Sequence, residues 1–230
     1  MVLVKNKIIG SKEHIIECYE KSTTFDKHYG RNFYSLAQQK ALSFGQSFGY
    51  PNDLALQVGA GLLAVYSPKM DWGRNIKVVE EFVNTGTVRN STALINSKAQ
   101  LISKCHDPMI VLGRLAYKTK AFYSAIRDPH GNQKVYNLEG IDDGYSLCTI
   151  DRHAGGVYNG EPLIEKERNY LGHPKVYKRI SNAYFNVARR LNIHVNDLQA
   201  ITWYQFRGEY KYISIAAIKN KQRKEQTINK

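Results

Sequence analysis

Cysteine is scarce in this sequence: three residues, Cys18, Cys105 and Cys148, lie far apart, and none belongs to a C-x-x-C pair. Three separated thiols cannot by themselves form a zinc knuckle or a four-thiolate iron–sulfur cluster. We therefore expect reduced, buried thiols and no metal or other cofactor.

Long apolar runs are also absent. No stretch approaches the ~20 apolar residues that a helix needs to cross a bilayer. The first residues, MVLVKNKIIGSKEH, lack the apolar core and the cleavage site of a secretory signal. These absences predict an intracellular protein without a membrane partner.

Acidic residues are few relative to basic ones: 20 Asp and Glu stand against 33 Lys and Arg, a formal charge of +13. An excess of this size in an otherwise ordinary composition favours a polyanionic partner, nucleic acid first, over a merely solvated basic surface. With no internal repeat and no Pro/Ser/Gly linker, residues 1–218 are predicted to form one monomeric domain, with helical lobes at about 50–125 and the remainder. Residues 219–230 form a basic tail.

Helical periodicity dominates the pattern, which predicts a mainly α fold. Apolar residues at steps of three and four predict one aromatic face of a long helix packed on a core: Phe25, Tyr29, Phe33, Leu36, Ala37, Phe44 and Phe48. Residues 54–65 are apolar almost all round and predict a central buried helix, in which Gly59, Ala60 and Gly61 allow a neighbour to approach closely. Asp71 is the predicted N-cap of a helix over 72–83, and another helix follows at about 91–105.

The second half of the sequence begins with a Gly-, Asp- and Asn-rich segment at 128–145, which predicts a loop or a short β-hairpin. After Pro174 an amphipathic helix has an apolar stripe for packing and a basic side for phosphates, formed by Lys175, Lys178, Arg179, Arg189 and Arg190. A last helix is predicted at about 195–206 and buries Leu198, Ile201 and Trp203.

Three short motifs occur in a meaningful order: GLLAVYSPKMDWGRNI at 61–76, LGRLAYKTKAFYSAI at 112–126 and TIDRHAGGVYNG at 149–160. In this order the chain resembles a remote member of the helix-hairpin-helix DNA glycosylase superfamily, of the endonuclease III and adenine mismatch glycosylase type, without the iron–sulfur cluster. The resemblance spans roughly 54–160. It implies a helical bundle of two lobes with a cleft, and double-stranded DNA from which one base is flipped out.

The resemblance also implies roles for single residues. Ser67, Pro68 and Lys69 match a turn whose side chain enters the duplex, with lysine in place of glutamine. Residues 112–119 match a phosphate-binding hairpin in which Lys118 holds the position of the nucleophilic lysine, although Arg114 and Ala116 replace the two glycines of that hairpin. Residues 150–153 match Val-Asp-Thr-His and place Asp151 on the catalytic aspartate.

This chemistry explains the residue types. Breaking an N-glycosidic bond builds positive charge on the sugar, which the carboxylate of Asp151 would stabilise while it activates the nucleophile. A neutral Lys118 amine would form a Schiff base and give AP-lyase activity. The resemblance and the basic composition together assign DNA contacts to Lys69, Trp72, Arg74, Arg114, Tyr117, Thr119, Lys120, Arg152 and His153.

Simpler roles remain open for each of these residues. Asp151 is also a favourable N-cap, and the two roles are compatible. Lys118 also suits a plain phosphate contact, His153 a structural hydrogen bond and Trp72 core packing. The alternative to a glycosylase is a non-catalytic nucleic-acid-binding protein on the same scaffold. A metal-dependent nuclease is disfavoured, because Asp142, Asp143 and Asp151 have no recognisable two-metal spacing.

Overall fold

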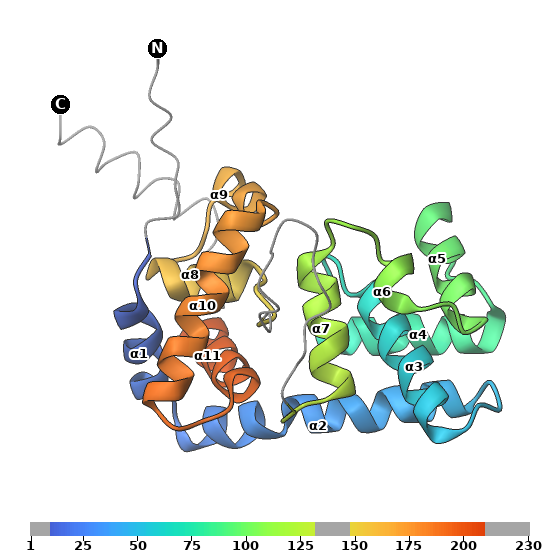
Figure 1. The fold of residues 1–230 in the computed structure, drawn as a ribbon, viewed down its shortest axis with the longest axis horizontal. Helices are drawn as coiled ribbons and strands as arrows, with labels where there is room; N and C mark the ends of the chain where they lie inside the picture. Colours follow the sequence, from blue (N-terminus) through green and yellow to red (C-terminus); the bar gives the residue numbers. More distant parts are fainter. Residues whose placement is uncertain (1–9, 132–147, 210–230) are drawn as a thin grey trace, which may run out of the picture. The chain divides into compact units, whose positions relative to one another are not determined.

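The computed structural model describes residues 10–131 and 148–209, and this part of the chain contains eleven helices and no strand (Figure 1). The prediction of a mainly α fold is confirmed. Most of the segment predicted as a loop or β-hairpin, and the whole basic tail, lie outside the described residues. In chain order the helices are α1 (Lys12–Lys21), α2 (Thr24–Gln46), α3 (Asn52–Tyr66), α4 (Trp72–Thr85), α5 (Ala93–Ser103), α6 (Pro108–Val111), α7 (Tyr117–Arg127), α8 (Arg152–Asn159), α9 (Glu165–Tyr170), α10 (Pro174–Arg190) and α11 (Val195–Glu209).

The chain divides into two compact units. Unit 1 contains the residues up to Arg31 and those from Ile150 onward, and unit 2 contains Asn32 to Thr149. Helix α2 therefore contributes its first residues to unit 1 and the remainder to unit 2. Unit 2 includes the whole of the lobe expected at about 50–125 and extends beyond it at both ends.

Helix α3 is the centre of unit 2. It contacts α4, α5, α6 and α7, and every residue from Val58 to Tyr66 is buried, which confirms the predicted central helix. Its glycines permit very close packing: a Cβ on Gly59 would lie 1.8 Å from the carbonyl oxygen of Ala41 on α2. Gly45 of α2 approaches the Ala55 carbonyl to the same extent. The predicted role of small residues in close approach is thus confirmed at Gly59.

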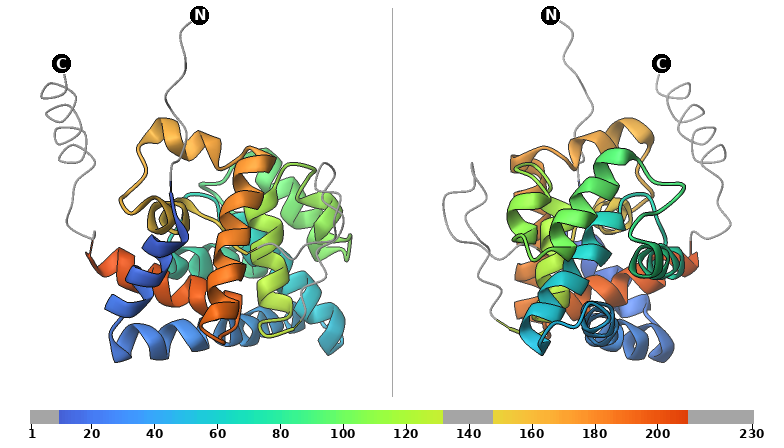
Figure 2. Two further views of the ribbon diagram at one scale, coloured as in Figure 1. Left: turned by 60° about the vertical axis from the view of Figure 1, so that its left-hand side comes forward. Right: turned by 90° about the vertical axis from the view of Figure 1, so that its right-hand side faces the viewer.

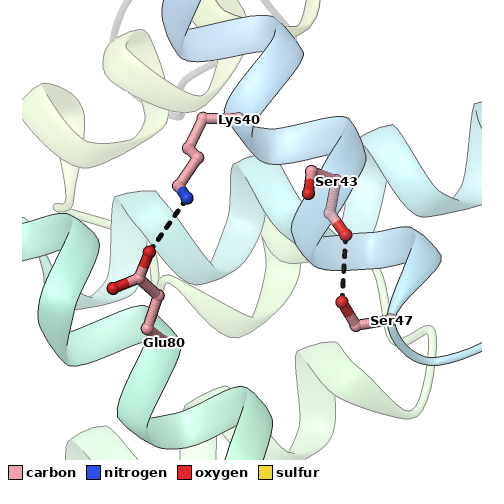
Figure 3. Close-up of polar contacts among 4 residues, drawn as sticks. All are labelled: Lys40, Ser43, Ser47 and Glu80. Carbon is pink, nitrogen blue, oxygen red and sulfur yellow. Dashed lines mark hydrogen bonds and ion pairs between the residues drawn. The ribbon is translucent and has the colours of Figure 1, made fainter.

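A surface ion pair also joins α2 to α4 in unit 2. The Lys40 Nζ lies 2.9 Å from Glu80 Oε1 (Figure 3). Near the end of α2 the Ser47 hydroxyl donates to the Ser43 carbonyl at 3.1 Å. Because the paired side chains are 36% and 45% exposed, the ion pair contributes at most about 1 kcal/mol to stability. The buried packing around α3 is therefore the larger stabilising contribution.

The aromatic face predicted for α2 is only partly correct. Ala37 and Phe44 are buried, but Phe25 is 60% exposed and Leu36 is 54% exposed. The buried stripe includes residues outside the predicted face: Gly30, Tyr34, Ala41 and Gly45. Close approach of backbones explains the difference, because a Cβ on Gly30 would lie 2.6 Å from the backbone of Ile201 on α11. Small residues, more than aromatic ones, decide which side of α2 packs.

Unit 1 is built from α1, α8, α10 and α11, which contact one another in every pairing (Figure 2). The apolar stripe predicted after Pro174 is buried, with Tyr177, Ile180 and Tyr184 at most 1% exposed. Leu198 and Ile201 of α11 are fully buried, as predicted. Trp203 is only partly buried, and it contributes to the site described next.

Candidate functional site

Asp151 is the N-cap of α8. Its Oδ1 accepts hydrogen bonds from the backbone N–H groups of His153, at 2.9 Å, and Ala154, at 2.8 Å. The carboxylate is half-buried, and no residue in the described part of the chain hydrogen-bonds to Oδ2. The capping role is thus confirmed, and among the described residues it uses only one of the two carboxylate oxygens.

Two buried tyrosines of α10 hold the backbone on both sides of Asp151. The N–H of Ile150 donates to the Tyr177 hydroxyl at 3.0 Å, and the Tyr184 hydroxyl donates to the Ala154 carbonyl at 3.3 Å. Both tyrosine rings are at most 1% exposed, so these bonds lie in the core of unit 1. The carboxylate is therefore carried by backbone whose position the core determines.

Helix α8 packs deeply into unit 1 because it contains two successive glycines. A Cβ on Gly155 would lie 2.8 Å from the Leu163 side chain, and one on Gly156 would lie 2.8 Å from the Phe206 ring. Larger side chains would push α8 outward and displace its cap. No role was predicted for these glycines, although the GG pair directly after RHA is a visible signal of close packing.

His153 sits among basic and aromatic groups. The Arg152 Nε donates to its Nε2 at 3.2 Å, and its ring meets Trp203 edge to face at a centroid distance of 6.2 Å. Burial lowers the pKa of His153 below the ordinary value of 6.5, and Arg152, Arg207 and Arg168 lower it further against the opposing charge of Asp151. The imidazole is therefore neutral at pH 7, and it fills the structural hydrogen-bonding role that was one of its expected functions.

A continuous series of rings leads away from His153, which we call the aromatic row: Trp203, Tyr204, Tyr29 and Phe25. Successive centroids lie 5.0, 6.2 and 4.2 Å apart. Phe25 is 60% and Tyr29 is 42% exposed, and the Arg207 guanidinium lies 4.8 Å above the Trp203 ring. Exposed aromatic rings are suited to stack on nucleobases. The predicted assignment of Phe25 and Tyr29 to a core face is wrong.

The second predicted catalytic residue, Lys118, lies in unit 2. It is half-buried in the first turn of α7, which follows the short helix α6 and a turn over 112–116. Gly113, directly before Arg114, adopts a φ of +100°, a left-handed conformation that favours glycine. The Lys98 Nζ donates to the Leu112 carbonyl at 3.0 Å and closes this turn. The segment thus retains a helix, turn, helix sequence.

The residues around Lys118 differ in their access to solvent. Arg114 is exposed, and Lys120 is half-buried. Tyr117 is only 2% exposed, so its ring offers no face for the expected DNA contact. The Thr119 hydroxyl donates to the Ala116 carbonyl at 3.0 Å, within its own turn. A phosphate contact by Thr119 would therefore use its backbone N–H or compete with that bond.

The turn between α3 and α4 carries the residues expected to enter DNA. Pro68 and Lys69 are exposed, and Lys69 adopts a φ of +62°, which is unusual for a residue other than glycine. Asp71 caps α4 by accepting from the Arg74 N–H at 3.0 Å, as predicted. Strain in an exposed turn persists only where its surroundings hold it, and it is a feature of many ligand-contacting loops.

Trp72, one of the expected DNA contacts, packs within unit 2. Its ring meets Phe33 at a centroid distance of 5.3 Å and Phe122 at 6.4 Å. Arg74, in the first turn of α4, is exposed. The packing role expected as the alternative for Trp72 is therefore present, and Lys69 is more exposed than Trp72.

The predicted site residues thus fall into two groups. Asp151, Arg152 and His153 lie together in unit 1, whereas Lys118 and the Lys69 turn belong to unit 2. The three cysteines are free thiols, with Cys18 and Cys148 buried. Within residues 10–131 and 148–209, no cluster of three or more His, Cys, Asp or Glu side chains has the arrangement of a metal site. Nor does any described helix have the length and apolar character to cross a membrane.

Comparison with known proteins places the chain in a family without naming an activity. No curated protein and no solved structure matches it. One family model matches residues 6–210, most of the chain, and carries the description "Family of unknown function (DUF7178)". The chain therefore belongs to the DUF7178 family.

Proposed function

We propose that this protein is a DNA N-glycosylase in which Asp151 stabilises the oxocarbenium-like sugar and activates the attacking water. The observation that carries the proposal is that the two oxygens of the Asp151 carboxylate have different hydrogen bonding. Oδ1 is held by two backbone N–H groups of α8, and within the described residues Oδ2 accepts no hydrogen bond. A carboxylate held in this way is pre-organised and needs no reorientation during the reaction.

The surroundings of Asp151 support a nucleic-acid substrate. Arg152 and Arg207 supply positive charge close to the carboxylate's helix, and both are exposed. The aromatic row extends from the same place and offers rings on which an extruded or unpaired base can stack. Because His153 is neutral, it adds no competing positive charge beside the sugar cation.

Lys118 extends the proposal to AP-lyase activity. In this reaction its uncharged amine attacks the anomeric carbon, the base departs, and the resulting Schiff base permits strand cleavage by elimination. Its place in the first turn of α7, after the left-handed Gly113, supports an assignment to the hairpin of the glycosylase superfamily. Base release through Asp151 and water does not require this step.

The test replaces Asp151 with Asn, which can keep the cap but loses the charge. Purified protein is incubated with duplex oligonucleotides that each carry one modified base, such as uracil, 8-oxoguanine or 5-hydroxymethyluracil, and released bases are measured by mass spectrometry. We expect at least one base to be released by the wild type and base release to fall by at least about 100-fold in Asp151→Asn. DNA affinity should stay equal or rise.

A matched control comes from the second aspartate cap in this chain. Asp71→Asn makes the same chemical change at the N-cap of α4, where Oδ1 also accepts a backbone hydrogen bond. This variant should release bases at the wild-type rate. Undiminished base release by Asp151→Asn would overturn the catalytic assignment, and binding without any base release by the wild type would favour the alternative, a non-catalytic nucleic-acid-binding protein.

A further inference from the structure

A second feature of unit 1 is an open groove of about 660 Å³ between the start of α1 and one side of α10. Four cations line it: Lys12 from α1, and Lys175, Lys178 and Arg179 from α10. These residues come from opposite ends of the sequence, so the fold creates a concentration of charge that no single segment contains. We call this feature the basic groove.

Contacts between α1 and α8 build one wall of the basic groove. The Ser11 N–H donates to the Tyr158 carbonyl at 2.9 Å, and His14 Nδ1 lies 3.1 Å from the same oxygen. Gly10 passes so close to Tyr158 that a Cβ would lie 2.1 Å from this carbonyl. Lys12, the first residue of α1, is thereby held opposite α10.

The other wall is the polar stripe of α10. Lys175, Lys178, Asn182 and Asn186 are spaced by three or four residues and line the groove together, while the opposite side of α10 is buried in unit 1. From residue 175 to residue 186 this stripe runs about 16 Å at 1.5 Å per residue. The Arg179 guanidinium lies 5.9 Å from the centroid of the Tyr158 ring, a cation–π contact.

The described lining of the groove contains more basic than acidic side chains. It contains one carboxylate, Glu13, whose pKa is lowered by hydrogen bonds from its own backbone N–H and from Ser11, so that it is ionised at neutral pH. Within the described residues, neither Lys12 nor Lys175 has a carboxylate within 4.0 Å. Four cations against one anion on a long, open surface suit a polyanion better than a single small anion.

We propose that the basic groove binds the phosphodiester backbone of nucleic acid. Lysine and arginine neutralise phosphates, and the Asn182 and Asn186 amides can donate hydrogen bonds to phosphate oxygens, which is how sequence-independent contacts position a strand. About 16 Å corresponds to about five nucleotides at 3.4 Å per step of one strand. The proposal goes beyond base excision, because the groove would bind nucleic acid even if Asp151 has no catalytic role.

The groove also has a defined relation to the candidate catalytic residue. Tyr158 lies near the end of α8, and Asp151 caps its start, so about 10 Å of rigid helix separates them along the axis. A strand held in the groove would therefore lie within a few nucleotides of Asp151.

The test compares two double variants that remove the same charge. Lys175→Gln/Lys178→Gln changes the groove, and Lys77→Gln/Lys104→Gln changes two exposed lysines of unit 2. Binding of fluorescein-labelled 20-nucleotide DNA, single-stranded and duplex, is followed by fluorescence anisotropy from 50 to 200 mM salt. We expect the groove variant to bind about tenfold or more weakly and its salt slope to fall by about 2, whereas the control keeps most of its affinity and slope.

A variant that is expected to bind DNA more strongly serves as a control, because misfolding can weaken binding but does not strengthen it. Glu13→Gln removes the one carboxylate in the described lining of the groove and should strengthen DNA binding, by about fivefold at 0.15 M salt. Equal losses in both double variants, or unchanged binding by both Lys175→Gln/Lys178→Gln and Glu13→Gln, would overturn the proposal. So would displacement of the DNA by equimolar inorganic phosphate, because the ligand would then be a small anion. Asp151→Asn should leave these affinities intact. The groove proposal is therefore tested by DNA affinity and the glycosylase proposal by base release, and either can fail without the other.

Discussion

Replacing Asp151 with Ala tests how much of the role of this residue is structural. The variant removes both hydrogen bonds that Oδ1 accepts, from His153 and Ala154. Loss of an N-cap typically costs about 0.5–2 kcal/mol. Because this cap satisfies two N–H groups in a half-buried position, we expect a loss in the upper half of that range, about 1–2 kcal/mol.

Asn and Ser at position 151 separate the cap from the charge. Both residues are good N-caps, so Asp151→Asn and Asp151→Ser should each lose less than about 0.5 kcal/mol. Asp71→Ala removes a cap that accepts a hydrogen bond from the Arg74 N–H, and should lose about 0.5–1 kcal/mol. Urea unfolding followed by circular dichroism gives these free energies of unfolding, provided that the transition midpoints shift at constant slope.

Two results would refute this reasoning. If Asp151→Ala is as stable as the wild type, the two hydrogen bonds contribute nothing and the position of the carboxylate is not determined by its cap. If Asp151→Asn loses as much stability as Asp151→Ala, the charge itself is structural. Loss of base release in Asp151→Asn would then no longer indicate catalysis, and the activity test would have to be made below the temperature at which the variant begins to unfold.

Three further predictions follow from packing, protonation and the position of Lys118. Gly59→Ala should destabilise unit 2 by about 2 kcal/mol or more in urea unfolding, because the new Cβ would lie 1.8 Å from a backbone oxygen of α2. Gly73→Ala, whose Cβ would lie 3.5 Å from the Asp71 side chain, should be neutral or stabilising. Equal losses of stability in the two variants would contradict the close packing at Gly59. His153 has a lowered pKa in the folded state, so its contribution to stability is present above pH 6.5 and is lost as the pH falls from there through the folded-state pKa. His153→Gln should therefore lose less stability than the wild type between pH 7.5 and pH 5. If the difference in free energy of unfolding between wild type and variant is the same at both pH values, the imidazole is not held neutral. Borohydride should trap a covalent adduct of the wild type with a duplex that contains an abasic site, and the adduct should disappear in Lys118→Ala but persist in Lys120→Ala; an adduct that persists in Lys118→Ala would exclude this amine.

Local signals in the sequence were sufficient for much of the fold. Asp71 before a 3.6-residue apolar pattern predicted the cap and start of α4, and both are present. The apolar run at 54–65 with its internal glycines predicted the buried helix α3 correctly. These features depend on neighbours within a few residues in the chain or on burial of a whole helix, and composition and spacing report both directly.

Features that depend on distant residues could not be found in this way. The periodic aromatic residues of α2 predicted a core face, but backbone contacts at Gly30 and Gly45 bury a different stripe and leave Phe25 exposed. A helical wheel ranks side chains by hydrophobicity and therefore undervalues glycine, which packs through its backbone. The basic groove was missed as a site for a related reason: the basic side of α10 was predicted, but its pairing with Lys12 depends on the contact of Ser11 with Tyr158, more than a hundred residues away.

Helix α8 shows how one short element can serve both proposals. Its start is anchored to α10 through Tyr184, and its end is anchored to α1 through the Tyr158 carbonyl. An isolated helix of eight residues has no stability of its own in water, so these anchors and the two buried glycines must hold it. The groove variants replace Lys175 and Lys178 on the polar stripe of α10 and leave its buried Tyr177 and Tyr184 in place, so changes in the basic groove and changes at Asp151 can be made independently. If both proposals hold, Lys175→Gln/Lys178→Gln should therefore lose DNA affinity, and Asp151→Asn should lose base release while it keeps DNA affinity.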